Sequence, residues 1–297
     1  PQLGDDRLDI FGGFIQETLS FSDRYFLTFA GRIDGATNFD PDKRTNFYPK
    51  VSGSYVLSSE PFWENSGISN VINSARIRTS YGEAGNLTAV GPYSRFGRYN
   101  PNEFQGTTTL SQSSALGNEG LEVERLKEFE IGTDVSLFNN RASILFTYYN
   151  QQISDLIVQR TLAPSEGGLS RFDNVGSMKN NGLEIYLRVT PIKTDNLKWD
   201  LNFNFSRNRN EVTATTGGPI SIATVSGAPP QVREGEPLGV FFGTYFARND
   251  DGSLLLTEDG LPQQERGDAL AGTVQRDGDG QPTGDPLRRV IGDPNPD

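Results

Sequence analysis

The segment 182–206 constrains the fold more than any other part of the sequence. Its two arms alternate apolar and polar residues on either side of a short connection at 191–196. The apolar positions are Leu183, Ile185, Leu187 and Val189 in the first arm, and Leu197, Trp199, Leu201, Phe203 and Phe205 in the second. Because successive side chains of a strand point to opposite faces, each arm is apolar on one side only. The segment is therefore predicted to be a β-hairpin, and its arms have the roughly 9 to 11 residues that a tilted strand needs to cross a bilayer.

The same alternation predicts three more hairpins, which brings the expected number of strands to eight. Their arms lie within 9–36, 47–82 and 126–152. The connections alternate in length along the chain. One set comprises 22–23, 59–74, 139–140 and 191–196, and the other comprises 35–46, 83–120, 160–178 and the residues from 211 onward. Short turns at one end and long loops at the other are typical of outer-membrane barrels. Within the first set, 59–74 is expected to form a short helix or structured turn capped by Ser59.

Composition agrees with an all-β chain and excludes several kinds of site. The sequence has 33 Gly, 19 Phe and 10 Tyr, and no run of 18 apolar residues that would predict a transmembrane helix. It has no Cys and no His, which removes thiol nucleophiles, the commonest zinc ligands and the usual general base. The net charge of −11 argues against nucleic-acid binding. We therefore expect a protein that is not an enzyme.

The predicted strands are expected to be part of a larger barrel. The chain begins without Met, ends in loop-like sequence, and carries very long loops for only eight strands. An open sheet in lipid would leave unpaired backbone groups at both edges, so spanning sheets must close. We expect transmembrane strands with their loops over 1–212, and an extracellular loop region rich in Gly, Pro and Asp over 213–297.

Several short motifs resemble one family in the same order. They are RTSYGEAGN at 78–86, a long hairpin at 126–157, DNVGSMKNNGLEIYL at 173–187, LKWDLNFNFSRNRNEV at 197–212, GEPLGVFFG at 235–243 and IGDPNPD at 291–297. Together they resemble the C-terminal barrel half of SusC/RagA-type TonB-dependent outer-membrane receptors. The resemblance implies an antiparallel barrel of the plugged 22-stranded type in the outer membrane of a Gram-negative bacterium. It also implies TonB-dependent import of oligosaccharides or peptides, with a SusD-like surface lipoprotein as partner and no cofactor.

Two groups of side chains are candidates for contact with a substrate or a lumen. Aromatic rings in long loops can stack on sugar faces, and the candidates are Tyr93, Phe96, Tyr99, Phe104 and Phe172. Polar residues on the inner face of the strands are expected at Arg32, Asp34, Arg76, Arg78, Glu128, Glu130, Glu184 and Arg188. Any single one of these residues is expected to pair with another polar side chain of the barrel strands. Aromatic residues toward strand ends are predicted to form interfacial girdles, and they include Tyr25, Tyr55, Tyr81, Tyr148 and Trp199.

The acidic C-terminal region contains a weak candidate for calcium binding. Residues 250–297 hold 11 acidic and 4 basic residues, a net of −7. The candidate ligands are Asp277, Asp279 and Asp285. Only the first two have the alternate spacing of a calcium loop, and no Glu ends a 12-residue frame. A flexible acidic loop is the preferred interpretation.

Two alternatives remain open at the level of sequence. An extracellular β-sandwich that serves as an adhesion or carbohydrate-binding module would have the same strand alternation. A simple diffusion porin would have the same wall and loops. The barrel is favoured because a sandwich has no reason to sort its loops by length.

Overall fold

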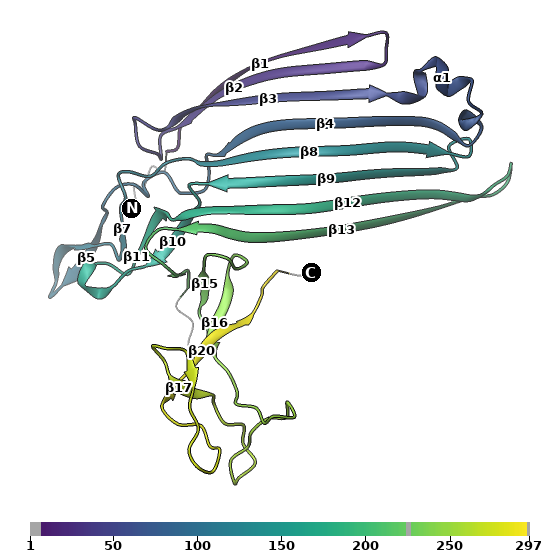
Figure 1. Cartoon of the computed structure of the whole chain (residues 1–297). Coiled ribbons are helices and arrows are strands. Elements are labelled where there is room, and N and C mark those ends of the chain that lie inside the picture. The colour runs from purple at the N-terminus through teal and green to yellow at the C-terminus, as the bar shows by residue number, and fades with distance from the viewer. Residues whose placement is uncertain (1–6, 224–226, 296–297) are drawn as a thin grey trace.

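An antiparallel sheet of eight long strands dominates the structure (Figure 1). The structure is a computed structural model that describes residues 7–223 and 227–295. The strands are β1 (Ile10–Phe21), β2 (Tyr25–Ala36), β3 (Thr45–Val56), β4 (Ile72–Asn86), β8 (Glu124–Leu137), β9 (Ala142–Ser154), β12 (Gly176–Lys193) and β13 (Lys198–Thr215). They follow one another in the sheet in chain order. The hairpin predicted at 182–206 is β12 and β13, and both strands extend well beyond the predicted arms.

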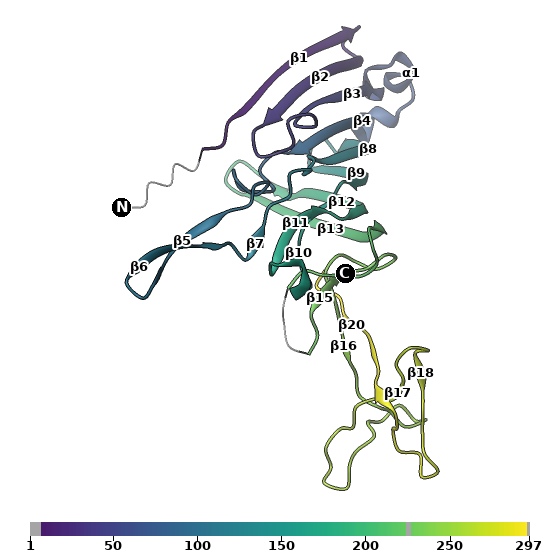
Figure 2. The same cartoon turned by 90° about the vertical axis from the view of Figure 1, so that its left-hand side faces the viewer.

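Three of the four connections at one end of the sheet are tight turns, as the sequence predicts, and the fourth is the longer connection 57–71. Ser22 and Asp23 both have positive φ in the turn between β1 and β2, and Phe138, Asn139 and Asn140 do so between β8 and β9. These turns lie at one end of the sheet, which we call the short-turn end. The opposite end carries the segments 37–44, 87–123, 155–175 and the chain after Thr215, and we call it the loop end. Figure 2 shows the sheet from the loop end as a curved row of strands, with the loop segments in front of it.

The loop end also carries small strands of its own. The segment 87–123 contains the hairpin of β5 (Tyr99–Phe104) and β6 (Thr107–Gln112), although nothing periodic in the sequence predicts it. Its β7 (Ala115–Leu116) joins a three-stranded sheet with β10 (Ile157–Thr161) and β11 (Ser170–Asn174). A 3₁₀ turn, η3 (Pro164–Glu166), connects β10 to β11.

The longest connection at the short-turn end is folded around a single carboxylate. It contains η1 (Leu57–Ser59), the one-turn helix α1 (Pro61–Glu64) and η2 (Ile68–Asn70). Ser59 is not the cap of α1, because the residue at the N-cap is Glu60 and no side chain caps the helix. The Glu60 side chain instead accepts hydrogen bonds from Arg24 Nη1 at 2.7 Å, Tyr25 Oη at 2.6 Å and Tyr55 Oη at 3.0 Å. This carboxylate therefore ties the helical connection to the β1–β2 turn and to the ends of two strands.

Register sorts the two faces of the sheet into apolar and polar. One row of directly paired residues runs Phe21, Tyr25, Tyr55, Ile77, Thr133, Phe146, Ile185 and Phe205. The adjacent row, on the other face, runs Ser20, Phe26, Ser54, Arg78, Gly132, Thr147, Glu184 and Ser206. Paired residues of an antiparallel sheet share a face, so the first row belongs to an apolar face and the second to a largely polar one.

Two clusters of buried apolar residues lie at the loop end, where the strands meet the loops. One cluster consists of Ala36, Phe39, Val90, Leu121 and Val123. A second consists of Val175, Val212, Ile220 and Val232. Asn38 is completely buried beside the first cluster and donates from Nδ2 to the carbonyls of Leu87 and Val90. The long loops are therefore packed against the strand ends as an ordered layer.

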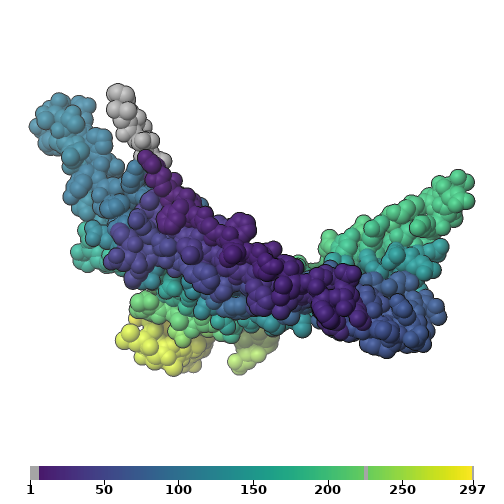
Figure 3. Space-filling model, turned by 90° about the horizontal axis from the view of Figure 1, so that it is seen from above, coloured from purple at the N-terminus to yellow at the C-terminus, as the bar shows by residue number. Residues whose placement is uncertain are grey.

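The region after β13 forms two further small sheets that extend away from the strands (Figure 1). The first contains β14 (Ile220–Ser221), β15 (Pro230–Val232), β16 (Val240–Thr244) and β20 (Arg288–Gly292), and the second contains β17 (Arg266–Asp268), β18 (Thr273–Val274) and β19 (Asp285–Pro286). Figure 3, which views the sheet from its β1 edge, shows this yellow region on one side and the green tip of β12 and β13 on the other. The last two residues of the 291–297 motif lie outside the described part of the chain.

The eight-stranded sheet is open within the described residues. Strands β1 and β13 are its edges, and each is paired on one side only. Within 7–223 and 227–295, no helix has the length and apolar character needed to span a bilayer. An open edge in lipid would leave a row of unsatisfied backbone groups, so the sheet must continue into further strands to be stable there. This agrees with the expected place of the chain inside a larger barrel.

Replacing Glu60 with Ala is expected to loosen the short-turn end. The hydroxyls of Tyr25 and Tyr55 and the guanidinium of Arg24 would lose their shared acceptor. Hydrogen–deuterium exchange of the full-length protein should show several-fold faster exchange at the backbone amides of residues 24 and 56. The control is Glu64→Ala, because Glu64 lies in the same helix and is exposed. Equal exchange in the two variants would contradict the role of Glu60.

An Arg placed on the apolar face is expected to destabilise the folded protein. Ile185→Arg should lower the free energy of unfolding by about 2 to 4 kcal/mol if the position lies near the bilayer midplane. The measurement is a denaturant titration of the full-length protein refolded in vesicles. Asn204→Arg is the matched control, because Asn204 pairs with Tyr186 on the polar face of the same hairpin. Equal stability of the two variants would contradict the assigned orientation.

Candidate functional site

A polar hollow of about 840 Å³ lies at the loop end. Four stretches of chain line it, namely 118–122, 160–163, 171–175 and 216–221. They bring together β10, β11, the end of the 87–123 loop and the first residues after β13. Ligand sites in proteins commonly have volumes of 300 to 1,000 Å³ and occur where several segments meet. This hollow is therefore a candidate binding site.

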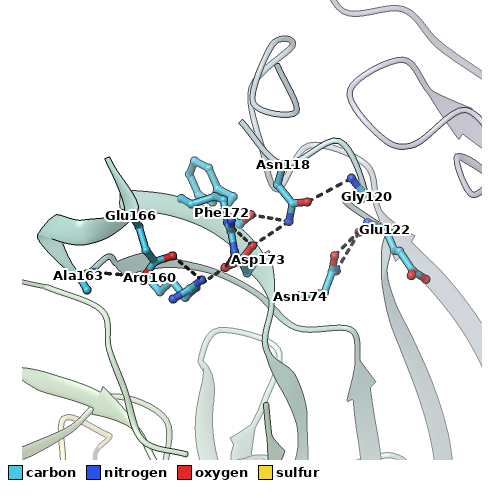
Figure 4. Close-up of polar contacts among 10 residues, drawn as sticks. Asn118, Gly120, Glu122, Arg160, Ala163, Glu166, Phe172, Asp173 and Asn174 are labelled. Carbon is cyan, nitrogen blue, oxygen red and sulfur yellow. Dashed lines mark hydrogen bonds and ion pairs between the residues drawn. The ribbon is translucent and has the colours of Figure 1, made fainter. Parts of the chain in front are cut away.

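Asp173 organises one wall of the hollow (Figure 4). Its carboxylate forms ion pairs with Arg160 on β10 and with Arg171 on its own strand, β11. Asn118 Nδ2 adds a third donor at 2.8 Å. Burial alone would raise the pKa of Asp173, but the hydrogen bonds from Arg171 and Arg160 outweigh burial and hold the pKa below its usual value. Asp173 is therefore ionised at neutral pH and fixes the positions of three donors.

Two asparagines join the 87–123 loop to β11. Asn118 donates from Nδ2 to the carbonyl of Phe172 at 3.0 Å, and its Oδ1 accepts the backbone N–H of Gly120. Asn174 donates from Nδ2 to the carbonyl of Glu122 at 3.0 Å and accepts the backbone N–H of Glu122 at 3.0 Å. The two amides clamp loop residues 118–122 onto the strand, as the paired dashed lines in Figure 4 show.

The charged residues that line the hollow balance one another. Asp173 pairs with Arg160 and Arg171, Arg160 also approaches Glu166 at 3.5 Å, and Glu122 pairs with Lys43 from the 37–44 loop. The Nη1 groups of both arginines make no hydrogen bond to any residue within the described ranges. The hollow therefore presents unpaired donors within a neutral surrounding, which suits a ligand that carries hydroxyl or carbonyl oxygens.

The predicted aromatic residues do not line this hollow. Tyr93, Phe96, Tyr99 and Phe104 lie in the 87–123 loop and are exposed by 37, 44, 66 and 66% respectively. Phe172 instead packs against the buried cluster of Ala36 and Phe39. The guanidinium of Arg95 lies 4.7 Å from the ring centroid of Phe96. Contact of these rings with a substrate stays a prediction.

The predicted lumen residues share the polar face of the sheet. Strand register places Arg32, Asp34, Arg76, Arg78, Glu128, Glu130, Glu184 and Arg188 on the face opposite the apolar row. Most of them pair within the wall. Arg76 Nε and Arg78 Nε both donate to Asp134, at 2.9 and 3.5 Å, and Arg32 pairs with Asp34. Glu130 accepts a hydrogen bond from Ser80, and Arg188 approaches Asp200 at 3.4 Å. That this face borders a lumen stays a prediction.

The calcium candidates lie apart from the hollow, in the small sheets after β13. Asp277 Oδ1 accepts the backbone N–H groups of Asp279 and Gln281 and closes a turn. In the described part of the chain, no group of three or more acidic side chains is gathered as a metal site. Calcium binding by Asp277, Asp279 and Asp285 stays a prediction.

Sequence reasoning missed the residues around Asp173. Arg171 and Asp173 are two residues apart, so an alternating strand would place them on one face. Arg160 comes from another strand of the loop, and the segment 160–178 shows no clear alternation from which its register could be predicted. Asn118 is more distant still in the sequence. The Arg-x-Asp spacing was the only available signal.

Comparison with known proteins identifies the family to which this sheet belongs. A family model described as the β-barrel of TonB-dependent receptor-like proteins matches residues 2–254. The chain belongs to this family. The TonB-dependent receptor P3 of Formosa agariphila is 30% identical over 93% of this chain and 28% of its own length. The TonB-dependent receptor SusC of Bacteroides thetaiotaomicron is 26% identical over 68% of this chain and 20% of its own length.

A solved structure supports the same placement of this receptor barrel. The structure described as the RagAB peptide transporter matches with a TM-score of 0.72 and 25% identity, over 82% of this chain and 26% of that chain. The receptor segment thus spans 20 to 28% of the length of these relatives. The resemblance to SusC/RagA-type receptors, the antiparallel barrel and the outer-membrane location are confirmed. The family is one of receptors and not of enzymes.

Asp173→Asn is expected to destabilise the wall of the hollow. The change leaves Arg160 and Arg171 with a neutral partner, and hydrogen bonds to charged groups contribute about 1.5 to 3 kcal/mol. Hydrogen exchange in β10 and β11 of the full-length receptor should become faster. Because the folded pKa of Asp173 is lowered, its stabilising contribution is present above the unfolded pKa of about 3.9 and is lost as pH falls through the folded pKa.

The matched control is Glu166→Gln on the same loop. Glu166 lies 3.5 Å from Arg160 and its side chain is 38% exposed, so this pair should contribute at most about 1 kcal/mol. Equal exchange rates in the two variants would show that Asp173 does not hold the loop.

Proposed function

We propose that the full-length receptor imports an oligosaccharide or a peptide across the outer membrane in a TonB-dependent manner. The observation that carries the proposal is the wall itself, with one apolar face, one polar face and a polar hollow among long loops at one end. A barrel built from such a sheet has a polar interior through which a polar solute can cross the membrane. The similarity to TonB-dependent receptors supports the dependence on TonB.

The hollow supports a neutral, oxygen-rich substrate. Arg160 and Arg171 have Nη1 groups without a partner among the described residues, while Asp173 and Glu166 pair with the same two arginines and cancel their charge. Sugar hydroxyls and peptide carbonyls both accept such hydrogen bonds. The hollow therefore supports both substrate classes, and one similar solved structure is described as a peptide transporter.

A SusD-like surface lipoprotein is proposed to cover the loop end. The packed loops form an ordered layer there, and the exposed rings of Tyr99 and Phe104 project from its β5–β6 hairpin. Aromatic residues are enriched where proteins meet one another.

The experiment is uptake by cells that express the full-length receptor with its neighbouring lipoprotein. Labelled neutral oligosaccharides and peptides are supplied separately, with and without TonB. We expect cells to take up one of the two substrate classes, and only when TonB is present.

A second test narrows the hollow. Ala163→Trp should weaken substrate binding about tenfold, or about 1.4 kcal/mol, because Ala163 lines the hollow and is exposed.

Ser165→Trp is the matched control. Ser165 is an exposed residue of the same 3₁₀ turn and does not line the hollow. The Ser165→Trp receptor should therefore bind the substrate with unchanged affinity. Uptake that persists without TonB would overturn energised import and favour a diffusion porin. Equal affinity of the two Trp variants would remove the hollow from the substrate path.

A further inference from the structure

The apolar face of the sheet is indented near the short-turn end. The indentation has a volume of about 510 Å³ and its apolar walls are Leu19, Phe21, Tyr25, Leu27, Tyr55 and Ile77. Its floor lies in the row in which Leu19, Leu27, Gly53 and Thr79 are paired across four strands. Gly53 has no side chain and Thr79 has a short one, so the surface falls away between longer neighbours.

The wall of the indentation is held rigidly. The rings of Tyr25 and Tyr55 stack with centroids 4.8 Å apart and an interplanar angle of 8°. Both hydroxyls donate to Glu60, which is only 8% exposed. Because the hydroxyls are anchored, the rings cannot turn to fill the space above Gly53. The indentation is therefore a preformed groove, which we call the Gly53 groove.

The surroundings determine what can occupy the Gly53 groove. In an outer-membrane barrel the apolar face meets the acyl chains of the bilayer. An empty groove would forfeit dispersion contacts along its lining, and a flexible hydrocarbon chain can restore them. At the short-turn end, Arg24 lies 6.0 Å from the ring centroid of Tyr25 and keeps 27% of its side chain exposed. Arg24 Nη1 is paired with Glu60 at 2.7 Å, so the exposed remainder of the guanidinium and the two tyrosines lie at the level of lipid headgroups.

We propose that the Gly53 groove binds one acyl chain of a phospholipid in the periplasmic leaflet. Short turns of outer-membrane barrels face the periplasm, so the groove opens into that leaflet. The chain lies over Gly53 and Thr79 between Leu27 and Tyr55, and the phosphate lies at the level of Arg24. Binding depends on the membrane face alone and is independent of the substrate that the receptor imports.

The test compares phospholipid retention by the full-length receptor and by a variant with a filled groove. Gly53→Leu places a side chain in the groove, and the backbone accepts it because the nearest heavy atoms to an added Cβ lie 3.9 and 4.0 Å away. The receptors are extracted from membranes in mild detergent and examined by native mass spectrometry. Wild type is expected to retain one phospholipid that Gly53→Leu loses at least threefold more readily.

Gly13→Leu is the matched control. Gly13 pairs with Ile33 on the same apolar face, and an added Cβ there meets nothing within 4 Å. This variant should retain phospholipid like wild type. Gly53→Ala is a smaller change and should give intermediate retention. It still tests the proposal if the leucine variant misfolds. Three results would overturn the proposal. Wild type could retain no phospholipid, it could retain lipopolysaccharide instead, or it could retain phospholipid equally with Gly53→Ala and Gly53→Leu.

Discussion

Backbone hydrogen bonding between neighbouring antiparallel strands is the interaction on which the rest of this structure depends. A shift of one residue in any pairing would move every side chain of that strand to the opposite face. In the described part of the eight-stranded sheet the observed shifts lie between Ile72 and Ser74, between Ser177 and Met178, and between Val189 and Ile192. All three are near strand ends. The central rows therefore stay aligned from β1 to β13, and the separation of apolar from polar residues extends across the whole sheet.

This arrangement moves the hydrophobic core away from the sheet. A single sheet with one face for lipid and one for a polar interior has no second layer against which to bury its strands. The apolar face remains exposed, as Phe203 and Phe205 at 56% each illustrate. Buried clusters occur instead where Phe39 and Leu121 pack beneath the loops. The bilayer thus supplies the apolar contacts of the strands, while the loops must supply their own.

The same division explains what could be predicted from the sequence. Alternation over 182–206 was sufficient to predict a hairpin and to separate its apolar from its polar side chains, because a period of two is a local property. The sorted loop lengths predicted the two ends of the sheet for the same reason. The hollow depends on Asn118, Arg160 and Asp173, which lie on three segments without a common period. Ser59 was expected to cap α1 from local capping preference, but Glu60 takes the N-cap position, and its carboxylate accepts from one donor in the β1–β2 turn and two donors on β2 and β3.

Two carboxylates order the two ends of the wall in the same physical way. Glu60 collects donors from residues 24, 25 and 55, and Asp173 collects donors from residues 118, 160 and 171. An ionised carboxylate can accept about four hydrogen bonds, so it can join several segments that share no backbone ladder. The membrane stabilises the middle of each strand but exerts no such influence where the chain leaves it. At each end, charge-assisted hydrogen bonds to one partly buried carboxylate stabilise the chain where the bilayer does not. Glu60 holds the edge of the Gly53 groove in this way, and Asp173 holds one side of the polar hollow.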